Sequence, residues 1–317
     1  RDRNNAIAII GAGVAGLAAA KCLRRKGVSV TIFEKSQRVG GRMATRRRDG
    51  HSFDHGAQYL TAHTPGFMDE VRRWQEAGSA DVWFDDKYVG VPGMTAMAQE
   101  LARKSEVVFG QQISRLRRNE SGWSLETEDE SETRYGKANY GAVVLAIPAP
   151  QALALAQTAG IDLPELERTV YAPCLAMMAS FESATTGVPD RLSPDDPVVM
   201  WLARNSSKPG RASAPETFVV HATPEWSRRY LNHTREEIGD LQLEAFYRLT
   251  GERQKPTAVM GHRWRYALVE NALRQPCVWR DDVRLGACGD WCLGPRVECA
   301  FESGVAMAGQ LTNAGKS

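Results

Sequence analysis

The sequence predicts an α/β protein in which a Rossmann-like dinucleotide-binding domain is combined with a discontinuous α+β domain. Near the N-terminus, the apolar run 6–10 leads into a G-x-G-x-x-G turn, a helix-like run follows to Lys26, and a second apolar run ends at Glu34. A short strand-like run returns far downstream at 283–288. Between them, from about residue 151 to 266, short strand-like runs surround one helix-like stretch. The pattern of residues 6–34 is typical of a βαβ unit. The strand-like run at 283–288 predicts that the α+β domain is inserted into the chain of the dinucleotide-binding domain.

The glycine-rich turn carries the binding chemistry of the first domain. Gly11 permits a tight turn, Gly13 lets the backbone approach a pyrophosphate, and Gly16 lets helix and strand pack closely. The helix N-terminus that follows stabilises an anion. Glu34 lies 18 residues after Gly16, where a carboxylate accepts a hydrogen bond from a ribose hydroxyl. This spacing predicts a bound dinucleotide.

Two further segments favour FAD over NAD as that dinucleotide. Gly40-Gly41-Arg42 forms a loop of backbone donors and a fork-shaped cation, which suits a pyrophosphate. Near the C-terminus, Gly289-Asp290 is a turn that is followed by a helix-like run at 297–311. An acid followed by a helix N-terminus suits the ribityl and pyrophosphate groups of an extended FAD. A nicotinamide domain would not need a segment so far along the chain.

The remaining elements follow from periodicity. We expect helices where apolar residues recur at spacings of three to four, and strands where short apolar runs are bounded by turn residues. The expected helices are Pro65–Ala77, Gly93–Lys104 and Arg235–Leu249, and the expected strands are Val107–Ile113, Trp123–Thr127 paired with Thr133–Tyr135, Ala142–Pro148, Ala176–Phe181, Val198–Leu202 and Thr217–His221. We assign 1–60, 95–150 and 270–317 to the FAD-binding domain, and 61–94 and 151–269 to the substrate domain.

Composition excludes several classes of partner. There are 40 basic and 38 acidic residues, and the net charge of +2 does not favour a polyanion. We interpret the basic runs 24–26 and 46–48 as a solvated helix end and a loop near the FAD phosphates, not as a nucleic-acid site. No apolar run reaches the roughly 18 residues of a membrane span, and the N-terminus does not resemble a secretory signal.

The six cysteines, at 22, 174, 277, 288, 292 and 299, lack the spacing of a zinc site. Most stand among apolar or small residues and are expected to be reduced thiols in the core. We therefore expect a cytoplasmic protein without a metal.

Over nearly its whole length the chain resembles the bacterial renalases, a branch of the FAD-dependent amine-oxidase-like flavoproteins. Residues 34–35 and 40–43 resemble the family's acid-to-GGRM segment, residues 56–62 its GAQY stretch, and residues 91–94 its PGM turn. These motifs are shared widely. The narrower motifs are Trp201–Asn205 with Ser207–Arg211, His221–Thr223 with Trp226–Arg228, His262–Trp264 with Tyr266–Ala267, and Cys288–Leu293 with Arg296–Glu298.

The resemblance implies oxidation of the 2-dihydro and 6-dihydro isomers of NAD(P)H to NAD(P)⁺, with O₂ as electron acceptor and hydrogen peroxide as product. Non-covalent FAD would supply the redox chemistry, so no catalytic side chain is required. Together with the glycine-rich turn, the resemblance implies the following FAD-binding residues: Gly11, Gly13, Val14, Gly16, Glu34, Lys35, Gly41, Arg42, Gln58, Tyr59, Ile113, Asp290 and Val297. The residues implied on the substrate side are Tyr59, Leu60, Thr61, Ala62, His63, Leu175 and Leu293.

Two features depart from the family pattern. The stretch between Trp83 and Val91 is short, which we expect to leave the mouth of the site more open. Leu175 stands where the family carries a Trp over the substrate, so an aromatic platform is lost there.

Two other functions remain open from the sequence. An amine oxidase of the same superfamily often has a lysine near the flavin, whereas we interpret Lys137, Lys208 and Lys255 as loop or surface residues. A FAD-binding protein without catalytic activity is the more distant alternative. Among the histidines, we expect His63 to touch substrate, and we expect His221 and His262 to make structural hydrogen bonds.

Overall fold

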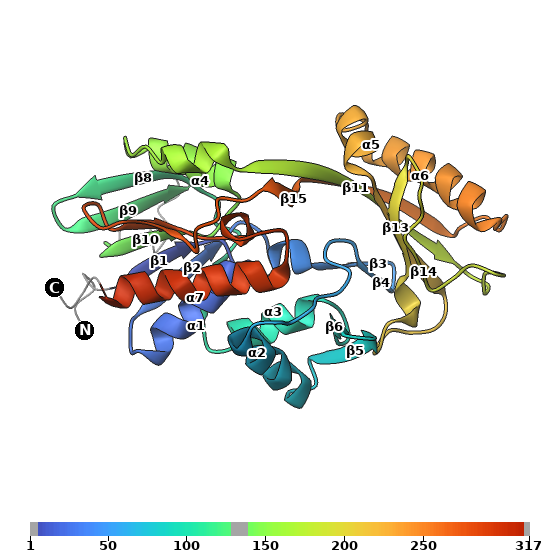
Figure 1. Cartoon of the computed structure of the whole chain (residues 1–317), viewed down its shortest axis with the longest axis horizontal. Helices are drawn as coiled ribbons and strands as arrows, with labels where there is room; N and C mark the ends of the chain where they lie inside the picture. Colours follow the sequence, from blue (N-terminus) through green and yellow to red (C-terminus); the bar gives the residue numbers. More distant parts are fainter. Residues whose placement is uncertain (1–5, 128–138, 314–317) are drawn as a thin grey trace.

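Two sheets organise the protein and lie at opposite ends of its long axis (Figure 1). The computed structural model describes residues 6–127 and 139–313. The first sheet has the order β16-β17-β10-β1-β2-β7, and the second has the order β12-β13-β14-β11-β15. The long strands β11 (Val170–Phe181) and β15 (Ala258–Asn271) pair with each other and connect the two ends. The expected α/β architecture with an inserted α+β part is confirmed.

The first sheet is parallel except at one edge. Its strands are β1 (Ile7–Ile10), β2 (Val30–Glu34), β7 (Glu106–Phe109), β10 (Ala142–Leu145), β17 (Leu285–Ala287) and the antiparallel edge strand β16 (Val278–Arg280). Every residue of β1 is buried, as expected for a strand that is covered on both faces. Alternate residues of the strand therefore belong to different cores.

Ile7 and Ile9 lie in one apolar cluster, and Ala8 and Ile10 lie in another. The first cluster is covered by α1 (Val14–Arg25), α2 (Pro65–Glu76), α3 (Thr95–Ala102) and α7 (Val297–Asn313). The second is covered by α4 (Ala149–Gln157) and by the hairpin of β8 (Ile113–Asn119) and β9 (Gly122–Thr127).

The second sheet is antiparallel and is covered by helices on its outer face. It contains β11, β15, β12 (Arg191–Leu192), β13 (Val199–Arg204) and β14 (Glu216–Ala222), with α5 (Pro224–Arg229) and α6 (Arg235–Thr250) outside. Its inner face meets the ribbon of β3 (Thr45–Arg48) and β4 (His51–Asp54), where Phe53 packs on Met178 and Val219. The hairpin of β5 (Ala80–Phe84) and β6 (Lys87–Gly90) is joined to residue 60 by a β-bridge from Tyr88.

Most expected elements are confirmed, and two expectations need correction. The run Val107–Ile113 is not one strand, because β7 ends at Phe109 and a new strand begins at Ile113. The partner of β9 is β8, whereas the expected partner Thr133–Tyr135 lies outside the described residues.

The second correction concerns the domain assignment of 61–94. Phe67, Val71 and Trp74 of α2 share an apolar cluster with Ile9 and Leu17 of the first sheet and α1. The α2 part of this segment therefore packs in the core of the dinucleotide-binding domain, whereas Trp83 contacts Trp201 of the second sheet. Within the described ranges, no helix is both long and apolar enough to cross a bilayer.

Helices α1 and α7 approach each other closely at a glycine. A Cβ atom at Gly304 would overlap the carbonyl oxygen of Ala15, whereas a Cβ atom at Gly309 on the same helix would meet nothing within 4 Å. The two glycines therefore form a matched pair: one is required by packing and the other is not.

We predict that Gly304→Ala destabilises the protein by about 1–3 kcal/mol, because the helices must separate. Gly309→Ala should be neutral or stabilise the protein by up to about 1 kcal/mol, because alanine favours the helix. Chemical denaturation followed by circular dichroism measures both. Equal effects of the two substitutions would contradict this close contact.

Candidate functional site

The glycine-rich turn has the geometry that a dinucleotide phosphate requires. Gly11 adopts φ +105°, and a Cβ atom there would overlap the carbonyl oxygen of Ala146. Gly13 is the N-cap of α1, no side chain caps that helix, and a Cβ atom at Gly13 would meet nothing within 4 Å. Open space beside uncapped N–H groups is what an incoming pyrophosphate needs.

Glu34 is held at the same turn. One of its carboxylate oxygens accepts a hydrogen bond from the backbone N–H of Ala12 (2.9 Å), and the other accepts one from Ser36 (2.8 Å). Gln111 donates its backbone N–H to the carbonyl oxygen of Glu34 (3.0 Å), which brings the start of β8 next to this acid. Ile113 thus lies two residues after a backbone contact with Glu34.

Arg42 and Asp290 join the two ends of the chain. The guanidinium donates to both carboxylate oxygens, with Nη1–Oδ2 and Nη2–Oδ1 distances of 2.8 and 2.6 Å, across 248 residues of sequence. Arg42 also donates to the backbone oxygens of Ala267 (3.0 Å) and Tyr266 (3.3 Å) of β15. Burial lowers the pKa of Arg42, but Asp290 more than offsets it, so the net shift is upward.

Four more of the residues expected to bind FAD lie near the glycine-rich turn or at the ends of helices and strands. Gly41 lies against Gly13, since a Cβ atom at Gly41 would be 3.5 Å from the Cα atom of Gly13. Val297 begins α7 shortly after Asp290, so a second helix N-terminus follows that turn. Lys35 is exposed at the end of β2 and Val14 begins α1. The fold therefore offers donors for phosphates and an acceptor for a ribose.

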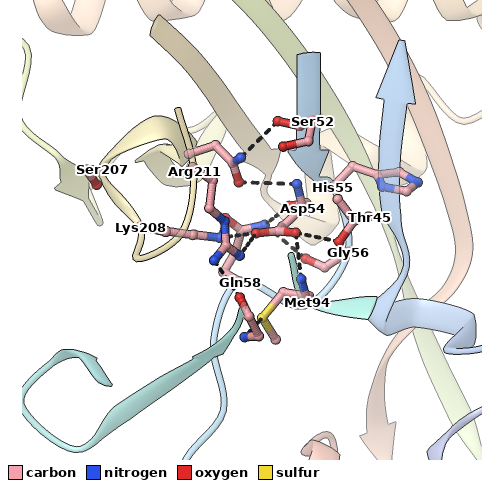
Figure 2. Close-up of polar contacts among 12 residues, drawn as sticks. Thr45, Ser52, Asp54, His55, Gly56, Gln58, Met94, Ser207, Lys208 and Arg211 are labelled. Carbon is pink, nitrogen blue, oxygen red and sulfur yellow. Dashed lines mark hydrogen bonds and ion pairs between the residues drawn. The ribbon is translucent and has the colours of Figure 1, made fainter. Parts of the chain in front are cut away.

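A buried cluster of charges lies beside Gln58 (Figure 2). Asp54 ends β4, and its carboxylate pairs with Lys208 (Nζ–Oδ2 3.3 Å) and with Arg211 (Nη2–Oδ2 2.5 Å). The other carboxylate oxygen accepts from Thr45 (2.7 Å) and from the N–H of Met94 (2.9 Å). The Lys208 and Asp54 side chains are both 0% exposed, so this pair is shielded from water.

Burial and the mutual interactions of these charges shift the pKa values of Asp54 and Lys208. Burial would raise the pKa of Asp54, yet Lys208 and Arg211 lower it to about 2. Burial lowers the pKa of Lys208 to about 8, although Asp54 opposes that shift. Two cations thus share one carboxylate, and the cluster carries an excess positive charge while Lys208 is protonated.

Gln58 connects this cluster to the aromatic residues around it. Its Nε2 donates to the backbone oxygens of Asp54 (2.5 Å) and Gly56 (3.0 Å). Its Oε1 faces Trp201 Nε1 (3.4 Å) and Lys208 Nζ (3.5 Å). The side-chain amide is therefore fixed in one orientation, and it positions the indole of Trp201.

Four half-buried rings gather next to Gln58. Tyr59 contacts Trp201 and Phe84 at centroid distances of 5.7 and 6.0 Å, and Trp83 contacts Phe84 and Trp201 at 5.0 and 6.4 Å. Cations lie over three of these rings: Lys208 over Trp83 (5.1 Å), Lys87 over Tyr59 (5.8 Å) and Arg191 over Phe84 (3.7 Å). We call Tyr59, Trp83, Phe84 and Trp201 the aromatic cluster.

The short stretch 83–91 does not leave this region bare. It folds as the tight β5–β6 hairpin, which places Trp83 and Phe84 against Tyr59 and Trp201. That its shortness leaves the mouth of the site more open stays a prediction. The hairpin brings aromatic rings to the same side as Gln58.

Leu175 is not on the substrate side. Its side chain is 0% exposed and packs with Ala222 and Ile238 beneath the outer helices α5 and α6. The inner face carries instead the neighbours Trp201, His221, Ala176 and His262, which lie side by side on four adjacent strands. Because side chains alternate along a strand, Leu175 faces away from its neighbour Ala176.

The histidines of the inner face are structural, as expected for His221. Its Nε2 contacts the carbonyl oxygen of His55 at 3.0 Å, and burial lowers its pKa to about 4. His262 packs edge to face on His55 at 4.6 Å, and burial lowers its pKa to about 3. The hydrogen bond expected for His262 is not found among the described residues, because its Nδ1 has no partner.

The other residues expected to touch substrate are spread over two environments. Leu60 is buried in the core of the first sheet. Thr61 and Ala62 are half-buried, and His63 and Leu293 are exposed. Both His63 and Thr64 donate their backbone N–H groups to Glu298 of α7 at 2.7 Å, which fixes this segment to the start of that helix.

The sequence does not predict the charged cluster. It indicates a loop or surface position for Lys208, but the side chain of Lys208 is fully buried. Lys255 is exposed as expected, and Lys137 lies outside the described residues. All six cysteines are free thiols, and no group of metal ligands occurs within the described ranges.

Comparisons with known proteins agree with this architecture. Residues 75–312 match the family described as flavin containing amine oxidoreductase, and residues 9–74 match the NAD(P)-binding Rossmann-like domain. The chain belongs to the flavin-containing amine oxidoreductase family.

Curated relatives match over only a part of their own length. The 4,4'-diapophytoene desaturase of Staphylococcus aureus (strain Newman) is 39% identical over 111 residues, which cover 32% of this chain and 22% of the desaturase. The corresponding enzyme of Staphylococcus haemolyticus (strain JCSC1435) is 60% identical over 91 residues, or 26% of this chain and 18% of that enzyme. The matched part is about a fifth of each desaturase.

Solved structures match over the whole chain. Cyclohexylamine oxidase from Brevibacterium oxydans IH-35A has a TM-score of 0.70 at 15% identity and is aligned over 98% of this chain and 99% of its own. Wild-type putrescine oxidase bound to putrescine has a TM-score of 0.67 at 14% identity, over 98% and 99%. At this level of identity the likeness establishes the fold.

We predict that Asp54→Asn destabilises the folded protein by about 3–5 kcal/mol, because it leaves two buried cations without a counter-charge. Lys208→Met should cost much less, because Arg211 still pairs with Asp54. The stabilisation by Asp54 is present above its unfolded pKa of 3.8 and is lost as the pH falls toward its folded value of about 2. Denaturation of both variants at neutral pH tests this order, and a larger loss in Lys208→Met would contradict it.

Proposed function

We propose that this protein is a renalase-like oxidase that converts the 2-dihydro and 6-dihydro isomers of NAD(P)H to NAD(P)⁺. FAD, bound without a covalent link, would accept a hydride at its N5 and pass the electrons to O₂, which yields hydrogen peroxide. The reduced cysteines suit a reducing compartment, and we propose the cytoplasm as the location.

The observation that carries this proposal is the combination of flat rings and positive charge beside Gln58. The aromatic cluster offers faces and edges to a planar ring, and Lys208 and Arg211 outnumber the single carboxylate of Asp54. Such surroundings favour a neutral ring that carries phosphates and disfavour an ammonium ion, because the excess charge beside Gln58 is positive and its one carboxylate is already paired.

Each group of residues has a role in this scheme. Gly11, Gly13 and Gly16 with Arg42 and Asp290 would hold the pyrophosphate and ribityl parts of FAD, and Glu34 would accept from the ribose. Gln58 fixes Trp201, and Tyr59 and Trp201 would orient the nicotinamide ring. We infer no general acid or base, because a C–H hydride donor requires none.

Oxidation of an amine is the second candidate, and a specific observation favours it. The buried Lys208, whose pKa is lowered to about 8, removes our sequence-based argument against a lysine inside the site. The match to the amine oxidoreductase family points the same way. The excess positive charge of the cluster argues against it.

We predict that anaerobic mixing with 2-dihydro or 6-dihydro NAD(P)H bleaches the flavin rapidly, whereas ordinary 4-dihydro NADH bleaches it slowly. C2 and C6 flank the ring nitrogen, so a ring flip exchanges them while C4 stays remote. Stopped-flow absorbance measures the three rates. Acid precipitation of the same sample should release the flavin into solution.

The opposite pattern of flavin bleaching would indicate a different function. Fast bleaching by a primary or secondary amine, with none by the dihydro isomers, would replace this proposal with the amine-oxidase function. Bleaching by neither class would leave a flavoprotein with another substrate.

A further inference from the structure

Arg191 is a cation with free donors at the edge of the aromatic cluster. It lies on β12, its side chain is exposed, and its guanidinium carbon is 3.7 Å from the centroid of the Phe84 ring. Within the described parts of the chain it has neither an ion pair nor a side-chain hydrogen bond. A guanidinium that lies over a ring has its N–H groups pointing outward in its own plane, where they can bind an anion.

The other basic residues around the aromatic cluster each have an acidic partner in the described residues, whereas Arg191 has none. Arg204, which follows on β13, pairs with Asp190 (2.9 Å) and with Glu216. Arg211 is committed to Asp54, and Lys87 pairs with Asp86 in the hairpin turn. Asp85 at the tip of that turn is exposed and raises the pKa of Lys87, after the larger effect of Asp86.

The position of Arg191 connects it to the ring-binding side of the site. Phe84 contacts both Tyr59 (6.0 Å) and Trp83 (5.0 Å), and Tyr59 follows directly on Gln58. A ligand whose ring lies at Tyr59 and Trp201 has its polar remainder within the reach of a cation placed on Phe84. The stacking also limits the rotamers of Arg191, so less entropy is lost when an anion binds.

We propose that Arg191 binds the pyrophosphate of the dinucleotide substrate and thereby selects dinucleotides over smaller nicotinamide compounds. This inference rests on the proposed function for the identity of the ring, but not for the chemistry of the anion. A pyrophosphate presents oxygens that match the fork of a guanidinium. Arg191 is thus a specificity residue at the binding step.

The test compares ligands with and without phosphates on the FAD-loaded protein. NAD⁺, nicotinamide riboside and inorganic pyrophosphate are titrated by calorimetry into wild type, Arg191→Gln and Arg191→Lys. Arg229→Gln is the matched control, because Arg229 is an exposed arginine on α5 that also lies over a ring, at 5.6 Å from the centroid of Tyr230, and has no ion pair in the described residues.

Arg191→Gln should raise the Kd of NAD⁺ and of pyrophosphate about tenfold, the effect of one charge-assisted hydrogen bond at an exposed site. The Kd of the riboside should stay unchanged, and Arg191→Lys should recover part of the loss. Added salt should weaken the binding of NAD⁺ to wild type more than to Arg191→Gln. Arg229→Gln should behave as wild type.

Equal weakening of NAD⁺ and the riboside would overturn the proposal, because it would mean that Arg191 only supports Phe84. Unchanged binding of NAD⁺ in Arg191→Gln would also overturn it, while oxidation of the dihydro isomers by wild type would leave the proposed function standing. If wild type oxidises none of the isomers, the proposed function fails. Pyrophosphate then decides: binding that Arg191→Gln loses supports the anion site, and no binding refutes it.

Discussion

The bidentate pair between Arg42 and Asp290 holds the site together. It joins the loop after β2 to the turn before α7, and Arg42 also binds the backbone of β15 as that strand leaves the second sheet. Three separate stretches of chain therefore meet at one guanidinium. The geometry of the glycine-rich turn is local, whereas this contact holds the turn before the C-terminal helix, which itself packs on α1.

A second junction, around Asp54, links the sheets on the substrate side. It connects β4, the segment at Met94 and the loop that follows β13 through one carboxylate. Gln58 makes hydrogen bonds both to the backbone of Asp54 and to the indole of Trp201. The charged cluster therefore also helps to position Trp201 of the aromatic cluster. Burial makes these contacts strong, and it makes removal of a single partner costly. The cluster thus couples the fold to the shape of the site.

Periodicity and turn residues in the sequence predict the elements whose structure depends on neighbouring residues. The βαβ unit, α2, α6 and α7 follow from periodicity, and Gly11, Gly13 and Glu34 stand where turn geometry requires them. The failures depend on contacts across the fold. Nothing near Lys208 in sequence reveals that Asp54, 154 residues away, draws it into the interior. The alternation of β11 decides that Leu175 faces the outer helices, and its register with β14 and β15 cannot be read from that residue alone. The length of the stretch 83–91 does not indicate what it contacts, because its aromatic residues determine those contacts.

The most direct test of this account is a double-mutant cycle on the FAD affinity, with Arg42→Gln, Asp290→Asn and the combined variant. The apo proteins are first compared by circular dichroism, so that loss of folding is separated from loss of binding. The account predicts that each single substitution weakens FAD binding and that the double variant is little worse than either, with a coupling energy of about 1.5 kcal/mol or more. Additive losses, or FAD binding that none of the variants changes, would contradict the central role of this pair.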